Sequence, residues 1–177
     1  MPATLKYTDE SDKCYGITGM AIGLVIWNAE DIMAAINLDA GPADVFEFVP
    51  EYYFCGNPRI SAKNSWSHVL KHYQATMGML IGNILCRSYV LHGTHPSKET
   101  RAKLLVCLDE EGRSSCALES DEVERVFNRS YAYLEKVFNH PGVHAVAHDF
   151  AKLLKERRQM SRADMMECLS RIAKFEG

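Results

Sequence analysis

Apolar residues recur along most of this chain at intervals of three and four positions, and stretches of strict alternation are few and short. The first spacing places side chains on one face of a helix, whereas alternation is typical of a strand. The pattern therefore predicts an all-α fold. Six helices are predicted, over residues 16–38, 61–91, 97–112, 120–139, 143–158 and from 161 onward.

The helix predicted over residues 61–91 is the longest of the six. It starts at Ser61, a favourable N-cap residue, and Gly93 follows its last turn. At about 1.5 Å per residue it is about 45 Å long, so other helices can pack along it. A chain of 177 residues has the length of one ordinary domain. We therefore expect residues 1–177 to form a single-domain bundle of about six helices around this long central helix.

Capping residues mark the starts of two later helices. Ser97 follows Pro96 and starts a helix that is predicted to stop at Gly112. Ser161, with Asp164 three residues later, has the pattern of a capping box and starts the last helix.

Two segments lie outside the helical pattern. Residues 1–15 are polar and acidic at their start, and we expect them to form a loose N-terminal arm. Residues 39–60 are expected to form an irregular connection. Residues 44–48 within it have the spacing of a short strand, but no partner strand is evident. The connection also carries a cluster of aromatic rings, which are Phe46, Phe48, Tyr52, Tyr53 and Phe54.

So much aromatic surface is not expected to remain in water. One aromatic side chain buries about 150–250 Å², and exposed apolar patches beyond a few hundred Å² usually mark contacts. These five rings are therefore the candidate interface residues for a second copy or a protein partner. The charge distribution favours an oriented partner as well, because residues 1–60 carry a net charge of −6 and the remainder +3.

Composition and cysteine usage indicate the compartment and exclude some partners. The six cysteines are scattered and none forms a C-x-x-C pair, so we expect a protein of the reducing cytoplasm. The longest uncharged stretch, residues 14–29, is too short to cross a membrane. The net charge of −3 does not favour nucleic acid as a partner.

All seven histidines fall into three short clusters, whose members are three or four residues apart. The clusters are His68 and His72, His92 and His95, and His140, His144 and His148. Helix-borne metal sites are built at such spacings, so the candidate metal ligands are His68, His72, His144 and His148. Their helix faces lie beside the apolar stripes and not within them. We therefore expect histidines at the surface or the core boundary, with no bound metal or other cofactor.

One short run has the pattern of a known enzyme family. Residues 144–152, with His148 followed by Asp149, resemble the His-Asp dyad region of HD-type metal phosphohydrolases, which are all-helical. The resemblance implies a metal-dependent hydrolase that uses histidine clusters. That family also has a distant later aspartate, and Asp164 is the only aspartate after Asp149. On a helix Asp149 points away from the side of His148.

The helix predicted over residues 16–38 is apolar all round, which is typical of a buried helix. It includes Asp31, and a buried carboxylate needs a partner. Arg59, Arg87 or a histidine can serve as that partner.

Common catalytic motifs are missing from the chain: it has no phosphate-binding P-loop, dinucleotide-binding glycine motif, nucleophile elbow or H-E-x-x-H. We therefore expect a non-enzymatic cytoplasmic interaction or assembly protein, acting as a homodimer or with another protein. The alternative is the HD-like metal-dependent hydrolase.

Overall fold

The computed structural model describes residues 6–41, 44–48 and 62–172, and for residues 62–69 it describes the backbone alone. Helices take up 74% of this part, which confirms the predicted all-α bundle. The helices are α1 (Glu10–Ile26), α3 (Ala62–Leu85), α4 (Lys98–Cys116), α5 (Ser120–Phe138), α6 (Pro141–Arg157) and α7 (Arg162–Leu169). The strands are β1 (Met33–Asn37), β2 (Phe46–Phe48) and β3 (Gln159–Ser161).

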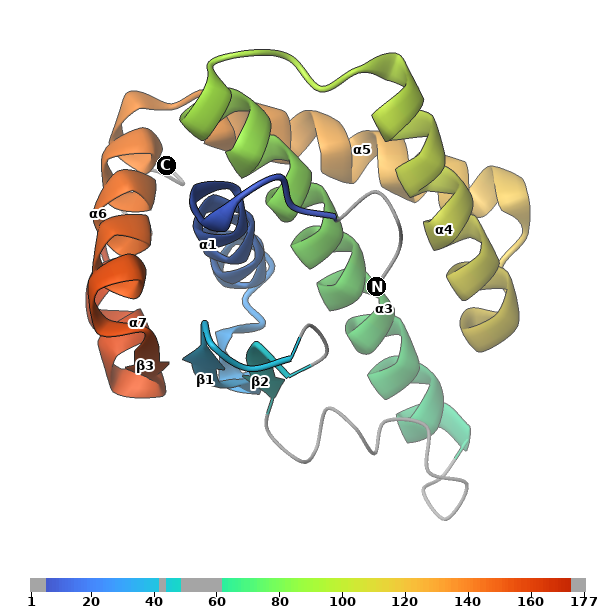
Figure 1. Ribbon diagram of the computed structural model, residues 1–177. Coiled ribbons are helices and arrows are strands. Elements are labelled where there is room, and N and C mark those ends of the chain that lie inside the picture. Colours follow the sequence, from blue (N-terminus) through green and yellow to red (C-terminus); the bar gives the residue numbers. More distant parts are fainter. Residues whose placement is uncertain (1–5, 42–43, 49–61, 173–177) are drawn as a thin grey trace.

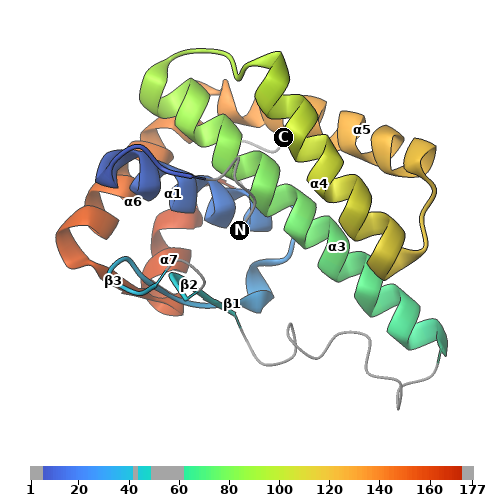
Figure 2. The ribbon, with the colours of Figure 1, turned by 45° about the vertical axis from the view of Figure 1, so that its right-hand side comes forward.

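Helices α1 and α3 cross at the centre of the bundle (Figure 1). Helices α4 and α5 pack against α3, and α6 packs against α1 on the side away from α3. Helix α3 continues without a break into a π-helix, Cys86–His92, so the long helix predicted over residues 61–91 is confirmed as a central element. Its first turns project beyond the other described elements (Figure 2).

Most residues of α1 are buried, as its all-round apolar surface predicts. The helix is covered by α3, α6, the π-helix and α7, so it has no broad face left for solvent. Elsewhere in the described ranges too, no helix combines the length and the apolar character that crossing a bilayer requires.

Four glycines allow α1 and α3 to approach each other closely. A Cβ added at Gly19 would overlap the carbonyl oxygen of Gly82, and a Cβ added at Gly82 would overlap that of Gly19. One turn further along the crossing, Gly23 lies against the backbone of Gly78 in the same way. Small side chains at such positions let helix backbones touch, so these residues determine the distance between the two helices.

The first helix differs from its prediction at both ends. It begins at Glu10 because the Asp9 side chain accepts a hydrogen bond from the Asp12 N–H, at 2.8 Å. Residues 10–15, expected in the loose arm, are therefore helical. The helix ends at Ile26, where Asn28 takes a left-handed conformation with φ of 53°, which asparagine tolerates well. The prediction of helix up to residue 38 is therefore wrong.

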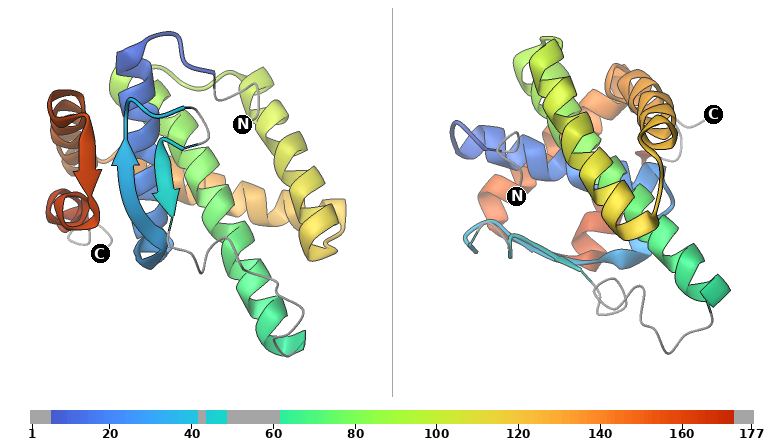
Figure 3. Two further views of the ribbon diagram at one scale, coloured as in Figure 1. Left: turned by 60° about the horizontal axis from the view of Figure 1, so that its bottom comes forward. Right: turned by 90° about the vertical axis from the view of Figure 1, so that its right-hand side faces the viewer.

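Residues 33–37 form the central strand of a small antiparallel sheet with the order β2-β1-β3. Strand β2 pairs with β1, so the short strand indicated within residues 44–48 does have a partner. Strand β3 links α6 to α7 and joins the C-terminal part of the chain to β1 (Figure 3). The sheet covers the end of the bundle from which the first turns of α3 project (Figures 1 and 3).

The later helices follow their capping residues closely. Ser97 caps α4, and Ser161 and Asp164 form the capping box that starts α7, as predicted. The stop predicted at Gly112 is wrong, because α4 runs on to Cys116. Gly112 is buried, and a Cβ there would meet Tyr73 and Val123 at 2.8 Å, so this glycine serves packing and does not end the helix.

We predict that Gly82→Ala lowers the free energy of unfolding by about 1–3 kcal/mol, because the added methyl group must push the α1 and α3 backbones apart. Urea denaturation followed by circular dichroism measures the change. The control is Gly41→Ala, at a position where an added Cβ meets no atom within 4 Å. An equal effect of both substitutions would contradict the tight crossing.

Candidate functional site

A polar cavity of about 220 Å³ lies beside the π-helix, at the end of α3 opposite its projecting turns. The N-terminal segment, the π-helix, the loop that follows it and the start of α4 contribute its walls. Its lining residues are Thr8, Asp12, Ile84, Arg87, Ser88, His92, His95, Pro96, Ser97 and Thr100. π-Helices are rare and are found frequently at functional sites, so this part of the chain is the candidate functional site.

A buried ion pair forms the inner wall of the cavity. Asp12 lies in the first turn of α1 with its side chain 2% exposed, and Arg87 lies in the π-helix with its side chain 13% exposed. Arg87 Nε donates to Asp12 Oδ1 at 2.7 Å, and Nη2 donates to Oδ2 at 2.6 Å. The Thr8 N–H also donates to Asp12 Oδ2, at 2.9 Å. This two-pronged geometry is the strongest form of an arginine–carboxylate pair.

Arg87 also fastens the N-terminal segment onto the α1–α3 crossing. Its Nη2 donates to the Lys6 carbonyl at 3.0 Å, and its guanidinium lies 4.9 Å from the centre of the Tyr7 ring. Asn83, one turn earlier, donates from Nδ2 to the Tyr7 hydroxyl at 2.9 Å and accepts from Arg87 Nη1 at 3.3 Å. The guanidinium is thus bonded to three parts of the chain.

Two opposing effects act on the pKa of Asp12. Burial alone would raise it, but the hydrogen bonds from Arg87 and Thr8 together outweigh burial, so the pKa lies below its usual range. Asp12 is therefore a stable carboxylate, suited to holding Arg87 in place and unsuited to taking up a proton near neutral pH.

Two histidines of the cavity are each backed by a carboxylate. His92 Nε2 lies 3.7 Å from Asp12 Oδ1. His95 is backed indirectly, because its Nδ1 lies 3.0 Å from the Tyr89 hydroxyl, which donates to Glu135 Oε2 at 2.9 Å. Burial and this bond to Glu135 raise the pKa of Tyr89 to about 12, so the phenol keeps its proton. The cavity therefore presents oriented imidazoles beside several hydroxyl groups.

The histidines of α6 have structural partners. His140 caps the helix, its Nδ1 accepting from the Gly142 N–H at 3.0 Å. His144 Nε2 contacts the Phe138 carbonyl at the end of α5. His148 Nδ1 lies 2.6 Å from the Tyr15 hydroxyl, and the two rings meet edge to face. The cluster thus joins α6 to α5 and α1.

The structure places the described candidate metal ligands on two separate helices. His72 lies on α3, whereas His144 and His148 lie on α6, and α1 passes between these helices (Figure 1). The side chain of His68 lies outside the described residues. Within the described part of the chain, no group of three or more histidine, cysteine, aspartate or glutamate side chains is arranged to hold a metal ion.

The acidic residue of the HD-like run points away from its histidine, as the helical spacing indicates. Asp149 forms an ion pair with Arg171 at 2.7 Å, on the α7 side of α6, whereas His148 faces α1. Arg157 and Asp164 form a second contact between α6 and α7, at 3.4 Å. The charged groove of about 430 Å³ between these helices is thus bridged by ion pairs.

Two of the candidate interface rings are described. Phe46 and Phe48 stack on each other in β2 with ring centres 5.1 Å apart; Phe46 is buried and Phe48 half-buried. Tyr52, Tyr53 and Phe54 lie outside the described residues.

Arg87, one of the three partners considered for Asp31, pairs with a different carboxylate, and Arg59 lies outside the described residues. Asp31 is exposed and lies 3.4 Å from Lys71. The carboxylate that takes Arg87 is Asp12, which fell within the predicted arm. A signal for Asp12 was present, because Asp12, Gly16, Gly19 and Gly23 follow the spacing of one helix face and that face packs on α3.

Comparisons of the chain with protein-family models, with curated proteins and with solved structures found no significant match. The function must therefore be inferred from the geometry of this chain.

We predict that Arg87→Met lowers the free energy of unfolding by about 3–5 kcal/mol, because it leaves Asp12 as a buried carboxylate without its cation. Urea denaturation at pH 7 measures the loss. The control is Arg125→Met, which breaks a pair whose two side chains are 69% and 76% exposed, and such a pair contributes about 0–1 kcal/mol. Similar losses in both variants would contradict the assigned role of Arg87.

We also predict that Asp12 contributes to acid sensitivity. Because its pKa in the folded protein lies below that in the unfolded chain, its contribution is present above about pH 4 and is lost as the pH falls through the folded-state pKa. The free energy of unfolding should therefore fall more steeply below pH 4 in the wild type than in Asp12→Asn. Parallel curves for the two proteins would show that Asp12 has no lowered pKa.

Proposed function

We propose that this protein is a non-enzymatic cytoplasmic interaction or assembly protein, and that its partner is a second copy of the same chain. The observation that carries the proposal is the projection of the first turns of α3 beyond the rest of the described structure (Figure 2). Among the described elements these turns extend beyond their neighbours, and short isolated helices are marginal in water. Contact with another chain stabilises such turns.

The neighbouring edge of the sheet also favours a dimer contact at this end of the molecule. Strand β2 is an edge strand at the same end of the molecule (Figure 3). It carries the stacked rings of Phe46 and Phe48. The Asp31–Lys71 contact joins the segment before β1 to the early part of α3, so sheet and helix form one continuous end. Edge strands readily pair with other chains.

A second copy fits this end better than an unrelated partner for a geometric reason. Most soluble homo-oligomers are twofold symmetric, and in such a dimer the same surface meets itself. Two projecting α3 helices can cross in this way, each filling the space beside the other. The aromatic residues of the connection, Tyr52 and Phe54, precede α3 in the chain and are the rings we assign to the contact.

The proposal predicts that the double substitution Tyr52→Ser, Phe54→Ser converts a dimer into a folded monomer. Aromatic residues at the centre of an interface contribute at least about 2 kcal/mol each, which is about thirtyfold in the dissociation constant. Sedimentation equilibrium measures the mass, and far-ultraviolet circular dichroism and the melting temperature report the fold.

A matched control removes apolar surface elsewhere. Val106 on α4 and Tyr133 on α5 are 57% and 42% exposed, so Val106→Ser, Tyr133→Ser should leave the dimer intact. A wild-type protein that is monomeric at tens of micromolar would overturn the proposal. So would a Tyr52, Phe54 variant that remains dimeric, or one that melts much earlier without any change of mass.

A further inference from the structure

The cavity beside the π-helix has no part in the proposed dimer, because it lies at the opposite end of α3 (Figure 1). Its inner wall is electrically balanced, since the Asp12 carboxylate is matched by the Arg87 guanidinium. Its remaining polar groups are two imidazoles and four hydroxyl groups, those of His92, His95, Thr8, Ser88, Ser97 and Thr100. The Thr8 hydroxyl donates to Asp12 Oδ2 at 3.3 Å, and the other hydroxyl groups and the imidazoles line the cavity beside the ion pair. The lining contains no unmatched carboxylate.

The hydrogen bonds around His95 determine which of its ring nitrogens carries the proton. Tyr89 has a single proton and donates it to Glu135, so its oxygen must accept from His95 Nδ1–H. His95 Nε2 is then the free ring nitrogen, and it becomes a charged donor whenever the imidazole takes up a proton. Tyr89 and Glu135 thus act as positioning residues for this nitrogen.

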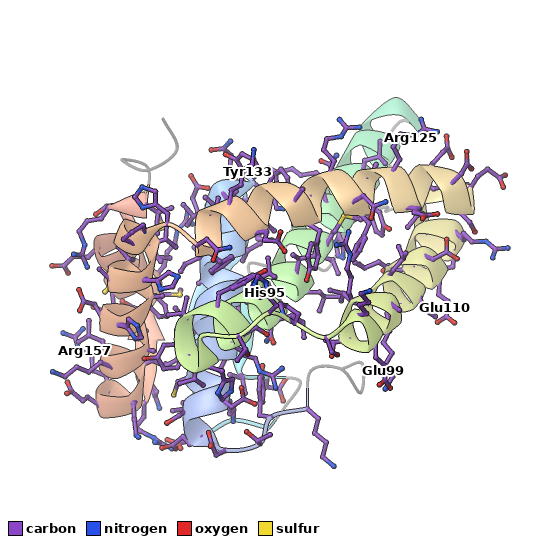
Figure 4. All side chains as sticks on the ribbon, turned by 90° about the horizontal axis from the view of Figure 1, so that it is seen from above. His95, Glu99, Glu110, Arg125, Tyr133 and Arg157 are labelled. Atoms are coloured by element: carbon purple, nitrogen blue, oxygen red, sulfur yellow. The ribbon has the colours of Figure 1, made fainter. Side chains whose placement is uncertain are left out.

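The start of α4 is a second feature of the cavity that favours an anion. Ser97 caps this helix of 19 residues, and its hydroxyl lies 2.8 Å from that of Thr100. The Thr100 N–H is bonded to Ser97 Oγ at 3.1 Å, and the other first-turn N–H groups carry partial positive charge, which favours an anion. Glu99, the acidic residue of this turn, pairs with Lys103 at 2.8 Å and points out to solvent (Figure 4). Its charge is therefore matched outside the cavity.

From this arrangement we infer that the cavity binds a small oxyanion, specifically a phosphate group. A tetrahedral phosphate accepts many hydrogen bonds at once, which suits a cavity lined by hydroxyl groups and imidazoles from several segments of the chain. The volume of about 220 Å³ is below the roughly 300–1,000 Å³ of sites for drug-sized ligands. The cavity therefore takes the phosphate itself, either as the free ion or as the end of a phosphate ester.

The experiment titrates the full-length protein with inorganic phosphate at pH 6.0 and constant ionic strength. Nuclear magnetic resonance of the histidine ring signals and calorimetry follow binding. The wild type should show saturable binding with a millimolar dissociation constant, with His92 and His95 signals shifting together. His95→Gln and Ser88→Ala should each weaken binding, His95→Gln by about tenfold, the usual effect of losing one charge-assisted hydrogen bond.

Two control variants distinguish specific binding of phosphate in the cavity from non-specific electrostatic binding to the protein surface. Arg125→Gln removes a charge at the far end of α5 from His95 (Figure 4), and His148→Gln removes an imidazole on α6. Both should change phosphate binding less than about twofold. Circular dichroism confirms that each variant is folded, and His95→Asn replaces His95→Gln if the latter is not.

A parallel titration with phosphoserine distinguishes the two sources of phosphate. Tighter binding of phosphoserine than of inorganic phosphate assigns the site to an esterified group, and weaker binding assigns it to the free ion; either result supports the inference. Failure of the wild type to saturate by about 50 mM phosphate overturns it. So does an equal weakening by His95→Gln and Arg125→Gln. None of these outcomes depends on whether the protein is a dimer.

Discussion

The close crossing of α1 and α3 is the constraint on which the rest of the structure depends. Gly19 and Gly82 meet backbone to backbone, and Gly23 and Gly78 repeat the contact one turn away. Because no side chain separates the helices, Asp12 at the start of α1 comes within hydrogen-bond distance of Arg87 on the π-helix. The cavity beside that pair therefore exists because the helices touch. Helix α3 therefore covers one side of α1, and α6 covers the opposite side.

The helices that the sequence predicted well are those defined by local signals. Ser97 and the pair Ser161 and Asp164 satisfy backbone groups within a few residues, so their effect is independent of the rest of the fold. The strand at residues 33–37 is different, because its hydrogen bonds go to β2 and to β3, and the second of these lies more than 100 residues away. Apolar spacing alone cannot distinguish a short buried strand from a helix. In the structure the left-handed conformation of Asn28 ends the helix before this strand.

The candidate site was predicted only in pieces. The histidine clusters were visible as spacings, but their roles depend on distant partners, such as Tyr15 for His148 and Glu135, through Tyr89, for His95. The sequence indicates Arg87 as a possible partner for a carboxylate. Asp12, however, lies within residues 1–15, which are predicted to form a loose arm. Extending the glycine face of α1 back by one turn reaches Asp12, so this part was within the reach of sequence reasoning. The π-helix was not, since the sequence of residues 86–92 carries no breaker residue.

The burial of α1 has a consequence for the order of events during synthesis. This helix leaves the ribosome before α3 and α6, which cover it, and α6 begins more than 100 residues after α1 ends. At about 5–20 residues per second, an apolar helix therefore waits on the order of ten seconds for its cover. During that interval the nascent chain exposes the surface that later becomes its interior. The cover of α1 is thus complete only after α6 has been made.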